Sequence, residues 1–139
     1  LRNSRIQVRK ELNASVPIVE AIEYKLQQVF LNLFLNARDA MPRGGWLTIA
    51  TSTGPDGAIV EVSDTGSGIP ADHLARIYDP FFTTKDIGKG TGLGLSITYG
   101  IVREHAGTIA CESMVGQGTR FTLTLPLAAR ELRRDAGRS

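Results

Sequence analysis

The sequence predicts an α+β sandwich of two layers, in which a mixed sheet of about five strands is covered on one face by about three helices. Stretches with the period of a strand and stretches with the period of a helix are intermingled, without the regular alternation of a doubly wound fold. The sequence contains no internal repeat. Its 139 residues, 42% hydrophobic and 22% charged, suit one compact domain with a core of useful size.

Apolar alternation marks the expected strands, and turn residues separate them. Ile6 and Val8 stand among polar neighbours near the start of the chain. The run Gly54-Pro55-Asp56-Gly57 has the composition of a turn between two strands. In chain order, the expected strands are residues 5–12, 46–52, 58–64, 107–114 and 119–126.

Proline and glycine bound the expected helices. Pro42 stops the first helix, Pro70 precedes the second, and Gly107 follows the third. Residues 79–93 combine a proline with a dense glycine series and are expected to form a loop. The expected helices are residues 23–41, 71–77 and 94–105.

Composition excludes several classes of protein. With Cys111 as its single cysteine, the chain forms no internal disulfide, which favours a reducing compartment. No run approaches the roughly 18 apolar residues of a membrane span, and no basic and then apolar leader opens the chain. Disordered, fibrous, disulfide-stapled and integral-membrane proteins are therefore excluded, and we expect a cytoplasmic domain that makes no membrane contact.

The charge of the chain is concentrated at one end. Residues 128–139 hold four arginines against Glu131 and Asp135, which accounts for the whole net charge of +2. The rest of the chain is neutral and lacks the basic stripe of a nucleic-acid-binding face. We therefore expect a domain over residues 1–127, a charged tail over residues 128–139, and no nucleic-acid partner. Because Leu1 opens the chain inside strand-like sequence, we also expect a domain cut from a longer protein, although a processed chain would look the same.

A polar stripe runs along the otherwise apolar first helix, which we expect to be buried because apolar residues lie almost all round it. Gln28, Asn32, Asn36 and Asp39 are spaced to fall on one face. Buried amides without partners cost about 1–3 kcal/mol each, so the stripe must face something polar. Neighbouring backbone or water would serve, and so would a ligand with a hard cation such as Mg²⁺, which suits asparagine oxygens.

An inward carboxylate ends the strand over residues 58–64. The period of two places Val60, Val62 and Asp64 on one face, so Asp64 continues a core-facing series. Gly66 and Gly68 follow, and they either permit a close approach of the backbone or make a plain turn. A carboxylate at this position can accept a hydrogen bond from a ligand amine.

Four glycines in seven residues, from Gly88 to Gly94, lead directly into the third helix. Free backbone N–H groups at such a helix start, aided by the helix dipole, can hold a phosphate. The spacing fits neither a P-loop nor a dinucleotide-binding fingerprint, and a flexible hinge is the alternative. Lys85 lies just before the series and Lys89 lies within it, and both favour an anion. A magnesium nucleotide needs a cation site, an inward carboxylate and a phosphate loop together.

The sequence contains five motifs in a fixed order. They are Asn32-Leu-Phe-Leu-Asn36, Asp64-Thr-Gly-Ser-Gly-Ile-Pro70, Pro80-Phe-Phe-Thr-Thr-Lys85, Gly90-Thr-Gly-Leu-Gly94 and Gly116-Gln-Gly-Thr-Arg-Phe121. The first four resemble the N, G1, F and G2 boxes of bacterial sensor histidine kinases, and the fifth resembles the closing motif of the same ATP-binding domain. The resemblance covers residues 5–126. It implies the Bergerat ATP-binding fold, with a mostly antiparallel sheet, and the cofactors ATP and Mg²⁺.

The resemblance also implies roles for individual residues. Asp64 would accept a hydrogen bond from the adenine amine, with Thr119 nearby and Ile69 against the ring. Asn36 would coordinate Mg²⁺, and Asn32 would lie beside the phosphates. The implied nucleotide-binding residues are Asn32, Asn36, Asp39, Asp64, Gly66, Gly68, Ile69, Phe81, Lys85, Gly88, Lys89, Gly90, Thr91, Gly92, Leu93, Gly94, Leu95 and Thr119, and the implied catalytic residues are Asn32, Asn36 and Lys85.

The glycine series would hold the phosphates, and residues 79–93 would form a lid over the nucleotide. Phe81 and Phe82 would pack this lid, and Lys85 or Lys89 would reach the phosphates. The expected protein is a histidine kinase fragment that binds ATP and needs a phosphoacceptor histidine from an upstream dimerisation domain, with a response regulator downstream.

The chain departs from the family pattern at three positions. Hydrolysing relatives carry a water-activating glutamate where this chain has Asn32, which favours phosphate transfer over hydrolysis. Many kinases carry a lysine where this chain has Asp39, and Arg38 points about 100° away around the helix. Ile22 stands where a capping aspartate is often found, so we expect a frayed helix start.

Neither histidine of the chain has the setting of a phosphoacceptor. His73 lies in the short second helix, and His105 ends the third helix, where a cation favours the dipole. Two other functions remain open beside the histidine kinase. One is a serine kinase or ATPase relative on the same fold, and the other is a pseudo-kinase that acts as an interaction module.

Overall fold

The computed structural model describes residues 5–12, 19, 21–82 and 93–128. Within them, five strands form one sheet in the order β1-β2-β3-β5-β4. Strands β1 and β2 pair in parallel, and the other three pairs are antiparallel, which confirms the mixed sheet. The strands are β1 (Ile6–Glu11), β2 (Gly45–Gly54), β3 (Gly57–Asp64), β4 (Thr108–Met114) and β5 (Gly118–Leu125), and the helices are α1 (Glu23–Ala40), α2 (Ala71–Leu74) and α3 (Gly94–Glu104).

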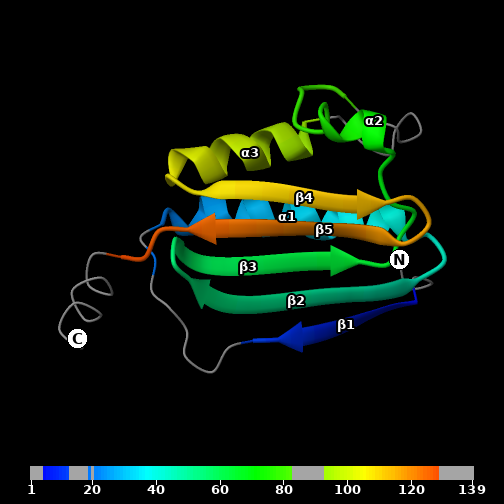
Figure 1. Ribbon diagram of the computed structural model, residues 1–139, viewed down its shortest axis with the longest axis horizontal. Coiled ribbons are helices and arrows are strands. Elements are labelled where there is room, and N and C mark those ends of the chain that lie inside the picture. The colour runs from blue at the N-terminus through cyan, green and yellow to red at the C-terminus, as the bar shows by residue number, and fades with distance from the viewer. Residues whose placement is uncertain (1–4, 13–18, 20, 83–92, 129–139) are drawn as a thin grey trace.

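The helices lie to one side of this sheet. In Figure 1, α1 runs behind the sheet, and no described helix crosses the face that is turned toward the viewer. The three helices and five strands confirm the predicted two-layer α+β sandwich. No helix in the described ranges is long and apolar enough to cross a membrane.

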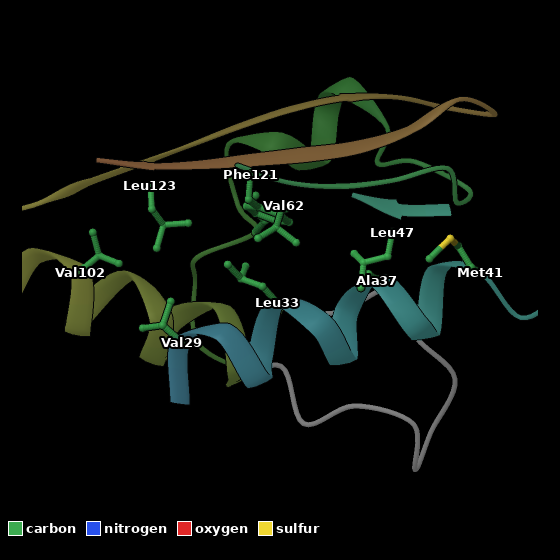
Figure 2. Packing of buried hydrophobic residues seen from close by; sticks show 10 residues of the cluster. Val29, Leu33, Ala37, Met41, Leu47, Val62, Val102, Phe121 and Leu123 are labelled. Carbon is green, nitrogen blue, oxygen red and sulfur yellow. The ribbon is translucent and has the colours of Figure 1, made fainter. Parts of the chain in front are cut away.

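The core fills the space between the helices and the covered face of the sheet. Val29, Leu33 and Ala37 recur every fourth residue on α1, so they share one side of the helix and are buried. Figure 2 shows these side chains directed toward the sheet. Their partners are Leu47, Val62, Phe121 and Leu123 of the strands and Val102 of α3.

The register of the strands places one polar row at the end of this apolar face. Val62 of β3 pairs with Phe121 of β5, which in turn pairs with Cys111 of β4. Two residues further along, the corresponding row consists of Asp64, Thr119 and Ser113. The same alternation that buries the apolar rows therefore turns this polar row toward the helices.

Burial around α1 is less complete than the sequence indicates. Leu31 is 52% exposed and Leu35 is 36% exposed. The expectation of an all-round buried helix is wrong at these two positions. They lie on the side of α1 opposite Leu33, where no described element covers the helix.

Helix α2 is shorter than predicted. The expected helix over residues 71–77 is helical only over Ala71–Leu74. Its backbone N–H groups bond the carbonyl three residues back, from His73 to Pro70 and from Arg76 to His73. The same i to i−3 pattern continues from Asp79 to Arg76, so tight turns replace the remaining helical turn.

The start of α1 is held by the end of α3. No side chain among the described residues caps α1 at Ile22. Instead, the Ile22 N–H donates to Nε2 of His105 at 3.1 Å, and Lys25 Nζ lies 2.7 Å from Glu104 Oε2. These tertiary contacts contradict the expected frayed helix start. Both ring nitrogens of His105 have backbone partners, because Nε2 accepts the Ile22 N–H and Nδ1 lies 2.8 Å from the Ile101 carbonyl oxygen.

Helix α3 ends in a left-handed residue that is not glycine. Ala106 has φ 58°, its N–H bonds the Arg103 carbonyl, and the Gly107 N–H bonds the Val102 carbonyl. This is the Schellman arrangement, in which glycine is the usual left-handed residue. Alanine is strained at this φ because of its Cβ.

We expect Ala106→Gly to raise the free energy of unfolding by about 0.5–1 kcal/mol, since relief of the left-handed strain exceeds the added freedom of the unfolded chain. Urea unfolding followed by circular dichroism measures the change. Ala110→Gly, in strand β4, is the control and should lower stability by a similar amount. Equal destabilisation by both changes would show that Ala106 is not strained.

Candidate functional site

Asp64 is the acidic member of the polar row. Its Oδ1 accepts the Gly66 N–H at 2.8 Å, and the carboxylate also accepts the Thr119 N–H. Burial raises the pKa of Asp64, while these two hydrogen bonds act in the opposite direction. The expected inward orientation is confirmed. A carboxylate has more acceptor positions than two N–H groups use, so Asp64 can accept a further donor.

The loop after β3 packs between α1 and the β4–β5 hairpin. The Ala40 carbonyl oxygen lies 2.5 Å from where a Cβ on Gly66 would stand, and it accepts the Ser67 N–H at 3.0 Å. Gly68 lies against the Met114 carbonyl in the same way. The sequence left open either a close approach of the backbone or a plain turn at these glycines, and the structure shows the close approach.

Ser113 ties this loop to the polar row. Its Oγ lies 2.7 Å from the Ile69 N, 2.9 Å from the Gly118 carbonyl oxygen and 2.8 Å from Thr119 Oγ1. The side chain of Ile69 packs against the core cluster. Sequence reasoning missed Ser113, whose only signal was a polar residue on the core-facing side of a strand.

The polar stripe of α1 faces the start of α3. Asn32 Nδ2 donates to the Gly94 carbonyl at 3.1 Å and to Thr98 Oγ1 at 3.2 Å. Gln28 Nε2 lies 3.5 Å from Asn32 Oδ1. Asn36 is half-buried one turn further along. Within the stripe, the side-chain amide of Asn32 thus finds its hydrogen-bond partners in the protein. Asn36 lies on the same side of the helix.

Asp39 and Arg38 form an ion pair, with Nη2 of Arg38 at 3.2 Å from Oδ1 of Asp39. The expectation that Arg38 points away is wrong, because its long side chain folds back across the helix surface. Such a partly exposed pair contributes no more than about 1 kcal/mol to stability. Its effect is to place a cation beside the carboxylate at the end of the stripe.

The start of α3 carries three of the implied phosphate-binding residues. Leu93 precedes the helix and its carbonyl accepts from Ser96 Oγ at 2.9 Å; Gly94 opens the helix, and Leu95 packs against the core. No side chain in the described residues caps this helix start. An α-helix leaves the N–H groups of its first turn without partners inside the helix.

The predicted lid is described only in part. Phe81 is 72% exposed, whereas Phe82 packs edge-on against His73 with ring centroids 5.4 Å apart. The guanidinium of Arg76 also lies 4.6 Å from the centre of the Phe82 ring. The rest of the predicted lid, residues 83–92, lies outside the described residues. It contains the predicted site residues Lys85, Gly88, Lys89, Gly90, Thr91 and Gly92.

Two further titratable groups lie near the polar row. Burial, with the nearby charges of Asp64 and Glu112, raises the pKa of the Cys111 thiol to about 12. Burial also raises the pKa of Tyr78. A thiol with this pKa is protonated at neutral pH and is a poor nucleophile, so Cys111 has a structural role.

Comparison with known families shows to which family the chain belongs. A family model described as histidine kinase-, DNA gyrase B-, and HSP90-like ATPase matches residues 21–129. The chain belongs to this ATPase family. The matched range contains α1, the polar row and the start of α3, and therefore every predicted site residue from Asn32 to Thr119.

Two similar relatives within the family are named as sensor kinases. Sensor kinase CckA of Brucella abortus (strain 2308) is 48% identical over 126 residues, which cover 80% of this chain and 13% of that protein. Sensor histidine kinase ZraS of Escherichia coli (strain K12) is 44% identical over 126 residues, which cover 90% of this chain and 27% of that protein. The chain thus spans well under a third of the length of these curated relatives.

Solved structures agree with this placement. The catalytic domain of histidine kinase ThkA superposes with a TM-score of 0.76 at 35% identity, covering 87% of this chain and 80% of that one. Full-length ShkA, solved in complex with AMPPNP, superposes with a TM-score of 0.74 at 29% identity, covering 88% of this chain and 26% of that one. In sequence and fold, this family member corresponds to the catalytic domain of sensor histidine kinases.

Proposed function

We propose that the chain binds Mg-ATP at the polar row and presents the γ-phosphate to a histidine on a separate, upstream dimerisation domain. The observation that carries the proposal is the half-buried Asp64 carboxylate, held by two backbone N–H groups at the end of an apolar sheet face. A fixed acceptor beside apolar surface suits a planar base that carries an amine. The resemblance to the sensor kinase motifs supports the same ligand.

At the base end, Asp64 would accept a hydrogen bond from the adenine amine. Ile69 supplies apolar surface next to it, because Ser113 holds the backbone of Ile69 against the hairpin. Thr119 stands directly opposite Asp64 in the sheet and is only 6% exposed. Hydrogen bonds between protein groups therefore hold this end of the site together.

At the phosphate end, the donor set fits Mg²⁺. The described residues hold no cluster of three or more His, Cys, Asp or Glu side chains able to bind a metal. Mg²⁺ in nucleotide sites needs only one or two protein oxygens, because phosphate oxygens and water complete its shell. The Asn36 side-chain oxygen would supply one. Bound there, Mg²⁺ would neutralise charge on the transferred phosphate.

Other residues would hold the phosphates themselves. The first-turn N–H groups of α3 have the character of an anion site. Lys85, Lys89 and the glycines between Gly88 and Gly92 would complete it and close the lid, with Phe81 in the lid. Asp39, paired with Arg38, would lie at the far end of the stripe.

The geometry favours transfer over hydrolysis. Asn32 uses its amide N–H₂ as a donor to Gly94 and Thr98, and an amide is no general base. Water bound near the γ-phosphate would thus lack the activating group of the hydrolysing relatives. Phosphoryl transfer by this chain would rest on positioning and charge stabilisation.

The phosphate acceptor would come from another domain. Both ring nitrogens of His105 are engaged, with Ile22 and Ile101, and His73 packs against Phe82. Neither is presented as a nucleophile. We propose residues 1–127 as the catalytic domain, residues 128–139 as a charged tail, and a response regulator as the final acceptor, in the cytoplasm and without contact to nucleic acid or membrane.

Magnesium-dependent ATP binding tests the proposal. We expect Mg²⁺ to tighten ATP binding to the wild type. In Asn36→Ala, this gain in affinity should fall by about tenfold or more, because a ligand to a charged group is lost. Calorimetric titration of ATP with Mg²⁺ or with EDTA measures it. Gln27→Ala, an exposed change on the same helix, is the control. Absence of ATP binding by folded wild type would contradict the proposal and favour the interaction module.

The chemistry of transfer needs the full-length protein. With γ-labelled ATP, a histidine kinase gives an acid-labile label on the protein. Acid-stable label would favour the serine kinase, and release of free phosphate without label would favour the ATPase.

A further inference from the structure

We propose that Ser113 sets the purine selectivity of the site by fixing the hydroxyl of Thr119 as an acceptor. The inference rests on the proposed function, because it assigns a role toward the base of the bound nucleotide. Ser113 is a positioning residue, since it acts on the base through Thr119 and Ile69.

The three contacts of Ser113 determine which atom donates in each. The Ile69 N–H can only donate, so Ser113 Oγ accepts at 2.7 Å. The Gly118 carbonyl can only accept, so the Ser113 hydroxyl donates its single hydrogen to this carbonyl oxygen at 2.9 Å. The hydroxyls of Ser113 and Thr119 lie 2.8 Å apart, and only Thr119 still has a hydrogen to donate between them. The Thr119 hydroxyl therefore donates its single hydrogen to Ser113.

The donors of Thr119 are then exhausted. Its N–H bonds the Asp64 carboxylate, and its hydroxyl hydrogen bonds Ser113. Toward a ligand, Asp64 and Thr119 thus present lone pairs only. Both residues lie on the covered face of the sheet, directly opposite each other in β3 and β5.

The lone pairs of Asp64 and Thr119, here called the acceptor wall, discriminate between the chemical groups at position 6 of a purine. Adenine carries an amine there, which donates, whereas hypoxanthine and guanine carry a carbonyl oxygen, which accepts. An acceptor placed against acceptors loses its hydrogen bonds to water without replacement. Sites built around such polar matching reject the mismatched ligand much more strongly than apolar pockets do.

Removal of the Ser113 hydroxyl would release this constraint. In Ser113→Ala, the Thr119 hydroxyl loses its acceptor and is free to rotate toward the base. It can then donate to a carbonyl oxygen at position 6. Asp64 keeps its bonds to Gly66 and Thr119, so ATP binding survives in a weakened form.

Calorimetric titration with Mg-ATP and Mg-ITP tests the inference, because the base of ITP has a carbonyl oxygen in place of the amine. We expect the wild type to prefer ATP, and Ser113→Ala to reduce the ratio of the ITP to the ATP dissociation constant about tenfold. Ser113→Thr keeps the hydroxyl and should retain the wild-type ratio. Ser63→Ala is the matched control, since Ser63 lies on β3 but points to the opposite face.

The outcomes separate this inference from the proposed function. A wild type that binds ATP and a Ser113→Ala variant that weakens both nucleotides equally would overturn the role of Ser113 alone. A folded wild type that binds neither nucleotide would overturn both proposals. Where Ser113→Ala does not fold, Thr119→Val replaces it. Loss of selectivity in Thr119→Val supports the acceptor wall, and an unchanged ratio overturns it.

Discussion

Replacement of Asp64 by asparagine is expected to weaken Mg-ATP binding about 100-fold, because a hydrogen bond to a buried charge is lost and an amide N–H₂ is placed against an amine. Asparagine has nearly the same shape, and its side-chain oxygen can still accept from Gly66 and Thr119. The fold should therefore persist, and the loss should lie in binding. Calorimetric titration of both proteins at neutral pH measures it.

Glu61→Gln provides the matched control for this change. Glu61 also carries a carboxylate on β3, but it lies on the opposite face of the sheet, three residues before Asp64. We expect ATP affinity close to that of the wild type in this variant. If Asp64→Asn bound ATP as tightly as Glu61→Gln did, the assignment of Asp64 to the adenine amine would be wrong.

The raised pKa of Asp64 gives this prediction a dependence on pH. Burial holds the pKa above 3.8, the value of an aspartate in water. The carboxylate that binds the amine is therefore lost on acidification at a higher pH than for an exposed aspartate. Stability changes in the opposite sense, since a carboxyl with a raised pKa contributes stability below pH 3.8 that is lost as the pH rises through the folded-state pKa. Asp64 thus favours binding at the expense of stability.

The sequence predicts the parts of the site that depend on local periodicity. The 3.6-residue period of α1 places Asn32 and Asn36 on one side, and the structure finds Asn32 there against Gly94. The two-residue period of β3 places Asp64 on the core-facing side, and the structure confirms it. Both inferences need only the geometry of one element.

What the sequence misses depends on contacts between elements. Ser113 becomes informative only once β4 is known to lie beside β5 in this register, which brings its hydroxyl to Thr119. The bond from Ile22 to His105 joins residues 83 positions apart, so no local signal reveals it. Leu31 and Leu35 were expected inside because apolar character alone does not show that one side of α1 is left uncovered.

Gly118 is the position at which we expect the largest effect on stability. It opens β5 with φ 131°, where side chains are rarely tolerated. A Cβ there would overlap the carbonyl oxygen of Asp64 and lie 2.9 Å from its carbonyl carbon. These are backbone atoms of the neighbouring strand, so the clash cannot be relieved by a side-chain rotation.

We expect Gly118→Ala to lower the free energy of unfolding by about 3–5 kcal/mol, as backbone strain adds to overpacking. Urea unfolding measures the loss. Gly116→Ala is the matched control in the same hairpin, because its φ is 83° but nothing lies within 4 Å of the added methyl. It should cost only about 1–2 kcal/mol, the strain of a left-handed residue. Equal costs at both positions would show that β5 can move away from Asp64. In that case the acceptor wall would not be rigid, and the selectivity proposed for Ser113 would lose its physical basis.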